Sequence, residues 1–354
     1  MSENSGLREI LSSSLIRREN DLSSPLREFW LKNKSMFSAS SDLEQRLTIS
    51  STAEIPAEWF DVKCPVLLVV DVQHDFVRGT LRTDLSSAGE DAVAIMDPIN
   101  ALLEMPFRKV FVSMDFHPNG HVSFYENRER WKVSPRSPTT NFKEAKIGDS
   151  ITIIDSRGTE KTQKLWPAHC IANTPGAALY KDLKIPLSSL IQMPEKTFHL
   201  IKKGTHPEVE SYSVFGNTEG PEDTGFSEQL KNCNADLLVI CGIAFDVCVV
   251  STALDAANRG LRVVVVEDAC VAISSEAKAN AFKEMVSAFI HIAKVDQIPA
   301  LISGEIVSLL HVAARLNRSH FPAQRREPHK LTPEELHTFF LPSQRFEEHE
   351  KADN

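Results

Sequence analysis

Apolar residues between positions 65 and 295 follow two alternating patterns. Short unbroken runs rich in β-branched residues are typical of strands buried on both faces, and they alternate with segments whose apolar residues have helical spacing. The predicted strands are 65–72, 108–115, 196–203, 235–242, 261–269 and 289–295, and the predicted helices are 88–104, 223–233, 246–260 and 274–288. This alternation predicts an α/β fold with a mostly parallel sheet covered on both faces.

The region 118–195 interrupts this alternation because it is long, polar and rich in proline. It is predicted to form an elaborated loop over one end of the sheet, with a β-hairpin that turns at Ser156-Arg157-Gly158. Loops of this length inside a compact domain are usually functional.

The two ends of the chain lack the strand pattern. Residues 1–60 are rich in serine and are predicted to form an N-terminal extension, partly helical or disordered, with helix candidates in SGLREILSSSLIRRENDL and SPLREFWLKNKSMF. Residues 61–300 hold the predicted α/β domain. Residues 301–354 are predicted to form a C-terminal helix and a frayed tail.

Composition narrows the class of protein. The 354 residues carry a formal net charge of -9, which argues against a general nucleic-acid or membrane surface. The sequence has no apolar run of membrane-spanning length and no signal-peptide pattern. The six cysteines form no CxxC motif, which favours reduced thiols inside a cell. We therefore expect a cytoplasmic protein, with access to the nucleus left open.

Asp71 ends the first predicted strand. Ligands bind at the carboxyl ends of strands in such sheets, so Asp71 is expected at the mouth of the site. Partial burial there raises the pKa of a carboxyl group, which suits a general acid or base. The structural alternative is a helix cap or a salt bridge that fixes a loop.

A second group of candidates has the side chains of a metal site. Asp115 ends the second strand, His117 follows two residues later, and His169 lies in the loop region. One carboxylate and two imidazoles suit a divalent ion, with open positions for water or substrate. His121 in the same loop competes as a ligand, and histidines that only fix the loop are the structural alternative.

Cys248 lies on the first turn of the helix after the fourth strand, and Lys203 ends the third strand. A helix N-terminus and a nearby ammonium group both lower the pKa of a thiol, so a thiolate is expected here. The alternatives are a small buried hydrophobic side chain for Cys248 and a solvated surface pair for Lys202 and Lys203.

Asp71, Lys203 and Cys248 come from three strand ends and are expected to converge on one face. Together they form an activated nucleophile with a proton shuttle. Asp71 would take the thiol proton, Cys248 would attack a carbonyl carbon, and Asp71 would return the proton to the leaving amine. Water would then hydrolyse the thioester, so the three residues predict amide hydrolysis through an acyl-enzyme.

Five segments, in this order, resemble the nicotinamidases of the isochorismatase-like cysteine hydrolases: VVDVQHDF, SMDFHPNGHVSF, LWPAHC, KKGTHPEVESYSVF and CGIAFDVCV. The resemblance covers residues 65–295. It implies a Rossmann-like three-layer α/β/α fold, an isochorismatase-like hydrolase domain over residues 61–300, and deamidation of nicotinamide to nicotinate and ammonia in NAD salvage.

The resemblance also assigns roles to single residues. It implies a catalytic triad of Asp71, Lys203 and Cys248. It implies one divalent ion that mainly anchors the substrate, with the protein ligands Asp115, His117 and His169. Zinc suits these ligands best, and iron and manganese accept them too.

The remaining implied features surround the nucleophile and the substrate. The backbone N–H groups of Ala244 and Cys248 would form the oxyanion hole, next to a cis peptide bond between Ile243 and Ala244. The aromatic residues that would flank the nicotinamide ring are Phe76, Trp166 and Tyr212.

Two other functions stay open at this point. Another amidohydrolase of the same superfamily, acting on a carbamoyl or ureido substrate, would share the triad but leave the Asp-x-His and Trp-Pro-x-His motifs unexplained. A non-catalytic binding protein is disfavoured because every catalytic position is filled. The expected partner is the small molecule nicotinamide, with neither nucleic acid nor membrane, and a homo-oligomer is compatible with the sequence.

Overall fold

The computed structural model describes the middle of the chain with short gaps, as residues 48–50, 61–138, 142–185, 197–217, 223–308, 310–312 and 314. The chain divides into two compact units, of which one spans Asp61–Glu305 and the other combines Met1–Phe60 with Ile306–Asn354. The helix candidates in residues 1–60 and the predicted frayed tail lie outside the described residues. The predicted segment boundaries stay predictions.

A parallel sheet forms the centre of the unit Asp61–Glu305. The six strands lie in the order β10-β9-β8-β2-β3-β7, and every neighbouring pair is parallel. In chain order they are β2 (Pro65–Val70), β3 (Lys109–Asp115), β7 (Thr197–Lys203), β8 (Leu237–Ile243), β9 (Arg262–Val271) and β10 (His291–Ala293). The predicted parallel α/β sheet is thus confirmed.

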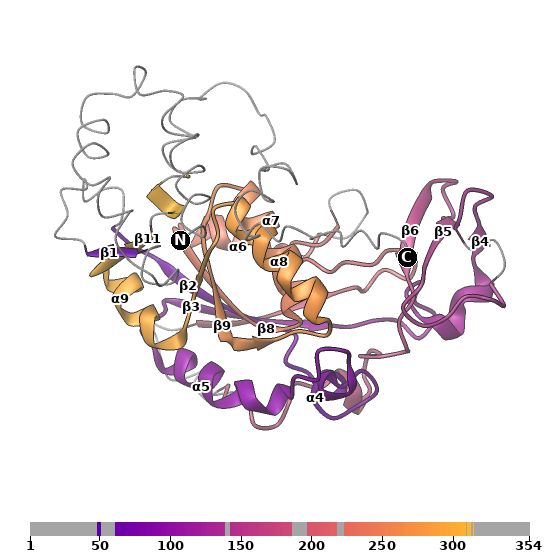
Figure 1. Ribbon diagram of the computed structural model, residues 1–354, viewed down its shortest axis with the longest axis horizontal. Helices are drawn as coiled ribbons and strands as arrows, with labels where there is room; N and C mark the ends of the chain where they lie inside the picture. Colours follow the sequence, from indigo (N-terminus) through magenta and orange to yellow (C-terminus); the bar gives the residue numbers. More distant parts are fainter. Residues whose placement is uncertain are drawn as a thin grey trace, which may run out of the picture. The chain divides into compact units, whose positions relative to one another are not determined.

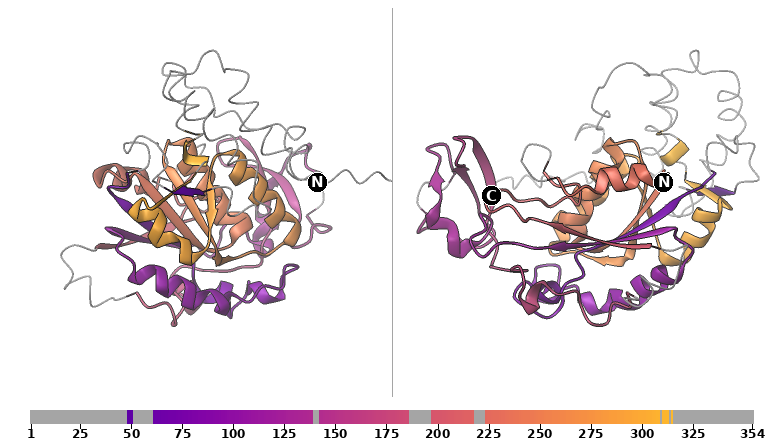
Figure 2. Two further views of the ribbon diagram at one scale, coloured as in Figure 1. Left: turned by 60° about the vertical axis from the view of Figure 1, so that its left-hand side comes forward. Right: turned by 180° about the vertical axis from the view of Figure 1, so that it is seen from behind.

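Helices cover both faces of this sheet (Figures 1 and 2). One face carries α5 (Met96–Glu104), and the other carries α6 (Phe226–Asn232), α7 (Val250–Asn258) and α8 (Ser275–Ser287). Ser274 caps α8, since its side chain accepts a hydrogen bond from the Ala277 N–H. The three-layer arrangement explains the unbroken apolar runs, because a strand covered on both faces has no polar side.

A small antiparallel sheet occupies the region where the alternation breaks, at the right of Figure 1. Its strands are β4 (Lys132–Val133), β5 (Ser150–Ile154) and β6 (Glu160–Lys164). The predicted hairpin is confirmed, since β5 and β6 pair around a turn in which Gly158 has a φ of 80°. The small sheet has its own apolar core, formed by Val122, Ala145, Ile151, Ile153 and Leu165.

Backbone hydrogen bonds join the two ends of this inserted region, and we call this junction the closed neck. Phe124 and Trp166 form an isolated parallel bridge, in which the Tyr125 N–H donates to the Trp166 carbonyl at 2.7 Å. The Trp166 N–H donates in turn to the Ser123 carbonyl at 2.8 Å. The inserted lobe, defined here as residues 125–165, therefore begins and ends at the same place.

Three local elements differ from the sequence-based expectation. The helix predicted from residue 246 begins with a π-helical turn, Phe245–Val249, before α7. The short helix α4 (His74–Val77) was not predicted. After α9 (Ile298–Ser303), Gly304 adopts a left-handed conformation that ends the helix. Ile306–Ser308 then form the strand β11, within the range 301–354 that was predicted to form a C-terminal helix and a frayed tail.

β11 pairs antiparallel with β1 (Thr48–Ser50), and both strands belong to the unit that combines the two ends of the chain. Among the described residues, no helix has both the length and the apolar character needed to cross a bilayer.

Candidate active site

The carboxyl ends of β2, β7 and β8 bring together the three residues predicted as a triad. The Lys203 ammonium lies 2.9 Å from the Asp71 carboxylate and donates to the Cys248 sulfur at 3.3 Å. Asp71 and Lys203 are fully buried, and Cys248 is 5% exposed. Asp71 follows β2 in a left-handed conformation, with a φ of 49° that L residues rarely adopt. The predicted convergence of the three side chains is present.

The pKa of the buried Asp71 carboxyl group suits a general base. Burial raises its pKa to about 6, although the positive charge of Lys203 acts in the opposite direction. The Ser113 hydroxyl donates a hydrogen bond to Asp71 Oδ1 at 2.7 Å, which also favours the charged form. Desolvation is the dominant effect, as expected from the position of Asp71 at the end of a buried strand.

Lys203 is a permanent cation in this site. Burial alone would lower its pKa, but the carboxylates of Asp115 and Asp71 raise it well above its usual range. Its ammonium group lies 2.5 Å from Asp115 Oδ1 as well as close to Asp71. Lys203 therefore links the triad to the predicted metal ligands.

The predicted direction of the Cys248 pKa is wrong. The sequence indicated a lowered thiol pKa at Cys248, but burial raises that pKa well above the ordinary value. Lys203 acts to lower it, whereas the negative charges of Asp71 and Asp115 act to raise it further. The ammonium charge that was expected to favour a thiolate is shared with two carboxylates, so it does not offset the effect of burial on the pKa of Cys248.

The turn that carries Cys248 has an unusual backbone. The peptide bond between Ile243 and Ala244 is cis, as the resemblance implied. Gly242 has a φ of 120°, and a Cβ atom there would collide with the backbone of Val70 on the neighbouring strand. Only glycine fits this position. The Ala244 carbonyl accepts hydrogen bonds from two backbone N–H groups of the turn.

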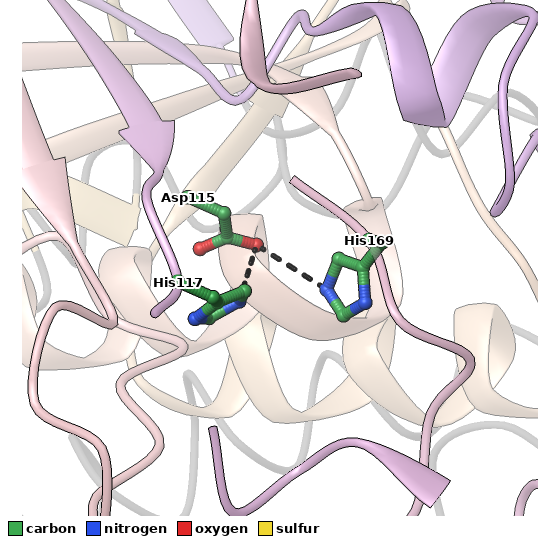
Figure 3. A group of neighbouring side chains, drawn as sticks. All are labelled: Asp115, His117 and His169. Carbon is green, nitrogen blue, oxygen red and sulfur yellow. Dashed lines mark ion pairs between the residues drawn. The ribbon is translucent and has the colours of Figure 1, made fainter. Parts of the chain in front are cut away.

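Asp115, His117 and His169 form a compact group at the end of β3 (Figure 3). Asp115 Oδ2 lies 3.7 Å from His117 Nε2 and 3.9 Å from His169 Nε2. His117 Nδ1 donates to the Gly204 carbonyl and His169 Nδ1 to the Pro167 carbonyl. Each ring therefore turns its Nε2 atom toward the Asp115 carboxylate.

This group fits a divalent metal ion. The possible ligand atoms of the three residues lie within 4.8 Å of one another. His117 Nε2 is buried and has no hydrogen-bond partner among the described residues. Burial opposes a charge on His117, yet the carboxylates of Glu210 and Asp115 raise the pKa of this imidazole to about 9. The pocket therefore favours positive charge, and the backbone carbonyls that orient both rings are typical of histidine metal ligands.

Comparison with known proteins gives the family. Residues 65–297 match the isochorismatase domain. This chain belongs to the isochorismatase family. The nicotinamidase of Acinetobacter baylyi is 33% identical over 62% of this chain and 88% of its own length. The nicotinamidase of Schizosaccharomyces pombe is 30% identical over 64% of this chain and 92% of its own length.

Solved structures agree with this family assignment. An Acinetobacter baumanii nicotinamidase and pyrazinamidase is 31% identical, covers 66% of this chain and 97% of its own, and has a TM-score of 0.52. The yeast nicotinamidase is 24% identical, covers 65% of this chain and 99% of its own, and has a TM-score of 0.53. The second likeness supports the isochorismatase-like fold.

Of the aromatic residues expected around the substrate of this isochorismatase-family site, Phe76 lies beside His169, and Trp166 and Tyr212 are hydrogen-bonded to each other. Trp166 Nε1 donates to the Tyr212 hydroxyl at 3.0 Å, and the Phe76 ring centroid is 5.5 Å from that of His169. Trp166 and Phe76 are each 8% exposed. Their role as ring-flanking residues stays a prediction.

Sequence reasoning missed Glu210. His117, His121 and Glu210 form a second group whose ligand atoms lie within 4.8 Å of one another, and it shares His117 with the first. The His121 ring stacks on His117 with 4.2 Å between centroids. A signal for Glu210 was available, since it lies in the same segment as Lys203, KKGTHPEVESYSVF.

Gln73 was also missed. Its side-chain amide donates to the Asp115 carbonyl and accepts from the Asp115 N–H, each at 2.8 Å. It also donates to the Ala177 carbonyl at 2.9 Å. Gln73 thereby fixes the backbone of Asp115, a role that depends on chain segments that only the folded structure brings together.

Proposed function

We propose that this chain is a nicotinamidase, which hydrolyses nicotinamide to nicotinate and ammonia in NAD salvage. The observation that carries the proposal is the buried contact of Lys203 with Asp71 and Cys248, directly beside the group Asp115, His117 and His169. Three relatives that are 30–33% identical over 62–64% of the chain are nicotinamidases.

The first chemical step is formation of a thioester. Possible ligand atoms of Asp71 and Cys248 lie within 4.8 Å, so proton transfer between them needs only a small movement. As the Cys248 sulfur attacks the amide carbon, its proton passes to Asp71. Asp71 then protonates the amide nitrogen, the carbon–nitrogen bond breaks, and ammonia leaves. Lys203 stays an ammonium ion throughout and stabilises the developing thiolate.

The second step is hydrolysis of the thioester. A water molecule attacks the acyl carbon while Asp71 takes one of its protons. The carbon–sulfur bond then breaks, the proton returns to the sulfur, and nicotinic acid leaves and gives its remaining proton to water, which yields nicotinate. The backbone N–H groups of Ala244 and Cys248 would donate to the oxyanion in both steps. A carboxyl group with a pKa of about 6 suits this repeated acid and base work.

The substrate would be held by the remaining residues. Asp115, His117 and His169 would hold one divalent ion, with zinc as the first choice and iron or manganese as alternatives with the same ligands. When bound, this ion supplies a positive charge that anchors the pyridine nitrogen. Phe76, Trp166 and Tyr212 would flank the aromatic ring and exclude water, which strengthens the polar interactions inside the site.

Ammonia release by the purified protein tests the proposal. The wild-type protein is expected to release ammonia and nicotinate in equal amounts from nicotinamide, and a strong chelator is expected to reduce turnover until the divalent ion is restored. Cys248→Ala is expected to be folded and inactive. Turnover that survives in Cys248→Ala would exclude the nucleophile. Release from ureido substrates but not from nicotinamide would exclude the proposed substrate.

We also propose the cytoplasm as the place of action. All six cysteines are free thiols in the structure, which agrees with a reducing compartment.

A further inference from the structure

Thr252 uses both hydrogen-bonding functions of its hydroxyl group in the protein interior. It lies on α7, four residues after Cys248, and its side chain is fully buried. The hydroxyl donates to the Cys248 carbonyl at 2.7 Å and accepts the Val214 N–H at 3.0 Å. It therefore forms a continuous hydrogen-bonded path from Val214 to the backbone of the nucleophile.

Val214 belongs to the segment that carries one of the aromatic residues. Tyr212 precedes it by two residues and accepts a hydrogen bond from Trp166 Nε1 at 3.0 Å. The Val214 carbonyl is fixed as well, since it accepts from the Thr224 hydroxyl at 2.6 Å. The proposed pocket has an aromatic side, formed by Tyr212 and Trp166, and a nucleophile side, formed by the turn that carries Cys248. The Thr252 hydroxyl thus connects these two sides.

The turn around Cys248 needs such anchors. Phe245–Val249 is a π-helical turn, in which the ordinary α-helical hydrogen-bond pattern is interrupted. The Asp246 carboxylate accepts from the backbone N–H groups of Ile273 and Ser274, at 3.0 and 2.9 Å. Asp246 therefore fixes the beginning of the turn against the β9–α8 connection, and Thr252 fixes its end.

We propose that Thr252 is a positioning residue that couples the Cys248 turn to the Tyr212 segment. It does not contact the reacting atoms. Its hydroxyl holds the Cys248 backbone at the position that Tyr212 and Trp166 define for the substrate ring. The inference rests on the proposed nicotinamidase function, because that function places a substrate between the two sides.

Thr252→Val and Thr252→Ser form the matched test. Valine keeps the shape but removes both hydrogen bonds, whereas serine keeps the hydroxyl. We expect kcat/KM for nicotinamide to fall about tenfold or more in Thr252→Val, since small misplacement of a nucleophile is costly. Thr252→Ser is expected to stay within about threefold of wild type, because restoring the hydroxyl restores the position.

Thr83→Val controls for the general cost of removing a buried hydroxyl. Thr83 is also fully buried, and its hydroxyl donates to the Glu90 carbonyl at 2.7 Å. We expect it to lower Tm about as much as Thr252→Val while leaving kcat/KM unchanged. Equal kcat/KM values in Thr252→Val and wild type would overturn the inference.

A double-mutant cycle with Tyr212→Phe tests the coupling itself. If Thr252 connects the two sides, the losses in kcat/KM from Thr252→Val and Tyr212→Phe are non-additive. Additive losses would reduce Thr252 to a structural residue and contradict the proposal.

The alkylation rate of Cys248 gives a readout that does not need turnover. A turn released from Thr252 opens more easily, so iodoacetamide is expected to label Cys248 several-fold faster in Thr252→Val than in Thr252→Ser, as measured by peptide mass spectrometry. Equal rates would overturn the positioning role. A wild-type protein without turnover but with this difference in rates would contradict the proposed function alone.

Discussion

Asp71 is a fully buried carboxyl group whose pKa lies near neutrality. Burial raises its pKa to about 6, and Lys203 and Ser113 limit the rise by favouring the charged form. Asp71 is therefore mostly ionised at pH 7, but its protonated form costs little to reach. A base that must accept a proton and return it in each half of the reaction needs this balance.

The activity is therefore expected to depend on pH with an acid limb near 6. Below that pH Asp71 is protonated and cannot take the thiol proton, so kcat/KM should fall by about tenfold per pH unit. Above it Asp71 is charged and kcat/KM should level off. A pH profile of kcat/KM with the metal ion held at saturation measures this limb. A flat profile between pH 5 and 8 would contradict the assignment of Asp71 as the base.

Ser113→Ala is expected to move that limb to higher pH. In the wild-type protein, the hydrogen bond from the Ser113 hydroxyl to Asp71 Oδ1 stabilises the charged carboxylate. The variant lacks this bond, so the pKa of Asp71 should rise. On the plateau, kcat/KM should stay within about threefold of wild type, because the base is present there in its charged form. Ser134→Ala removes a buried hydroxyl in the inserted lobe and should leave the limb in place. An unmoved limb in Ser113→Ala would exclude this role.

Residues at strand ends could be predicted because a parallel sheet places all its carboxyl ends on one edge. Asp71, Asp115 and Lys203 follow from this rule alone. Gln73 could not be predicted, since its three hydrogen bonds go to two residues, Asp115 and Ala177, in distant segments. The thiol pKa of Cys248 was predicted in the wrong direction, because the sequence shows neighbouring charges but not the degree of burial.

At the scale of elements, β8 and the turn that follows it decide where Cys248, the proposed nucleophile, lies. Gly242 lets β8 approach β2 closely, and the π-helical turn then carries Cys248. The sequence predicted the strand and the helix but not the π-helical turn between them. Apolar spacing follows side chains and does not distinguish one kind of helical turn from another over five residues.

Gly242→Ala is expected to destabilise the protein strongly. The new Cβ atom would collide with the Val70 backbone, which cannot move without disturbing the sheet. We expect a loss of about 3 kcal/mol or more in the free energy of unfolding, together with loss of activity. Gly158→Ala is the control, because Gly158 also has a positive φ but faces open space, so the cost should be about 1 kcal/mol. Similar urea midpoints for the two variants would contradict the close-approach argument.

At the scale of the whole molecule, stability should depend on the pH through buried histidines. His291 on β10 is 1% exposed, and burial lowers its pKa to about 4. The unfolded chain binds a proton at this residue below about pH 6.5, whereas the folded chain does not. The stabilisation is therefore complete above that pH and is lost as the pH falls toward 4.

Replacing this histidine should flatten the pH dependence. Between pH 7 and 5, wild type is expected to lose about 2 kcal/mol more unfolding free energy than His291→Leu, since each unit of pKa difference corresponds to about 1.4 kcal/mol. Urea titrations of both proteins at the two pH values measure the difference. His121 and His169 remain in both proteins, so their contributions cancel. Equal losses would contradict a neutral buried His291.

The closed neck of the inserted lobe has a consequence for where the length of such a chain can change. The lobe lies in sequence between His117 and His169, but the bridge between Phe124 and Trp166 brings its two ends together before the second histidine is reached. Lengthening or shortening the lobe beyond that bridge leaves the spacing of the two imidazoles untouched. Glu126 and Asn127 in the lobe also hydrogen-bond to the backbone of Ala168 and His121, so insertions such as a fluorescent reporter are expected to leave the site unchanged only in the part of the lobe beyond these two residues.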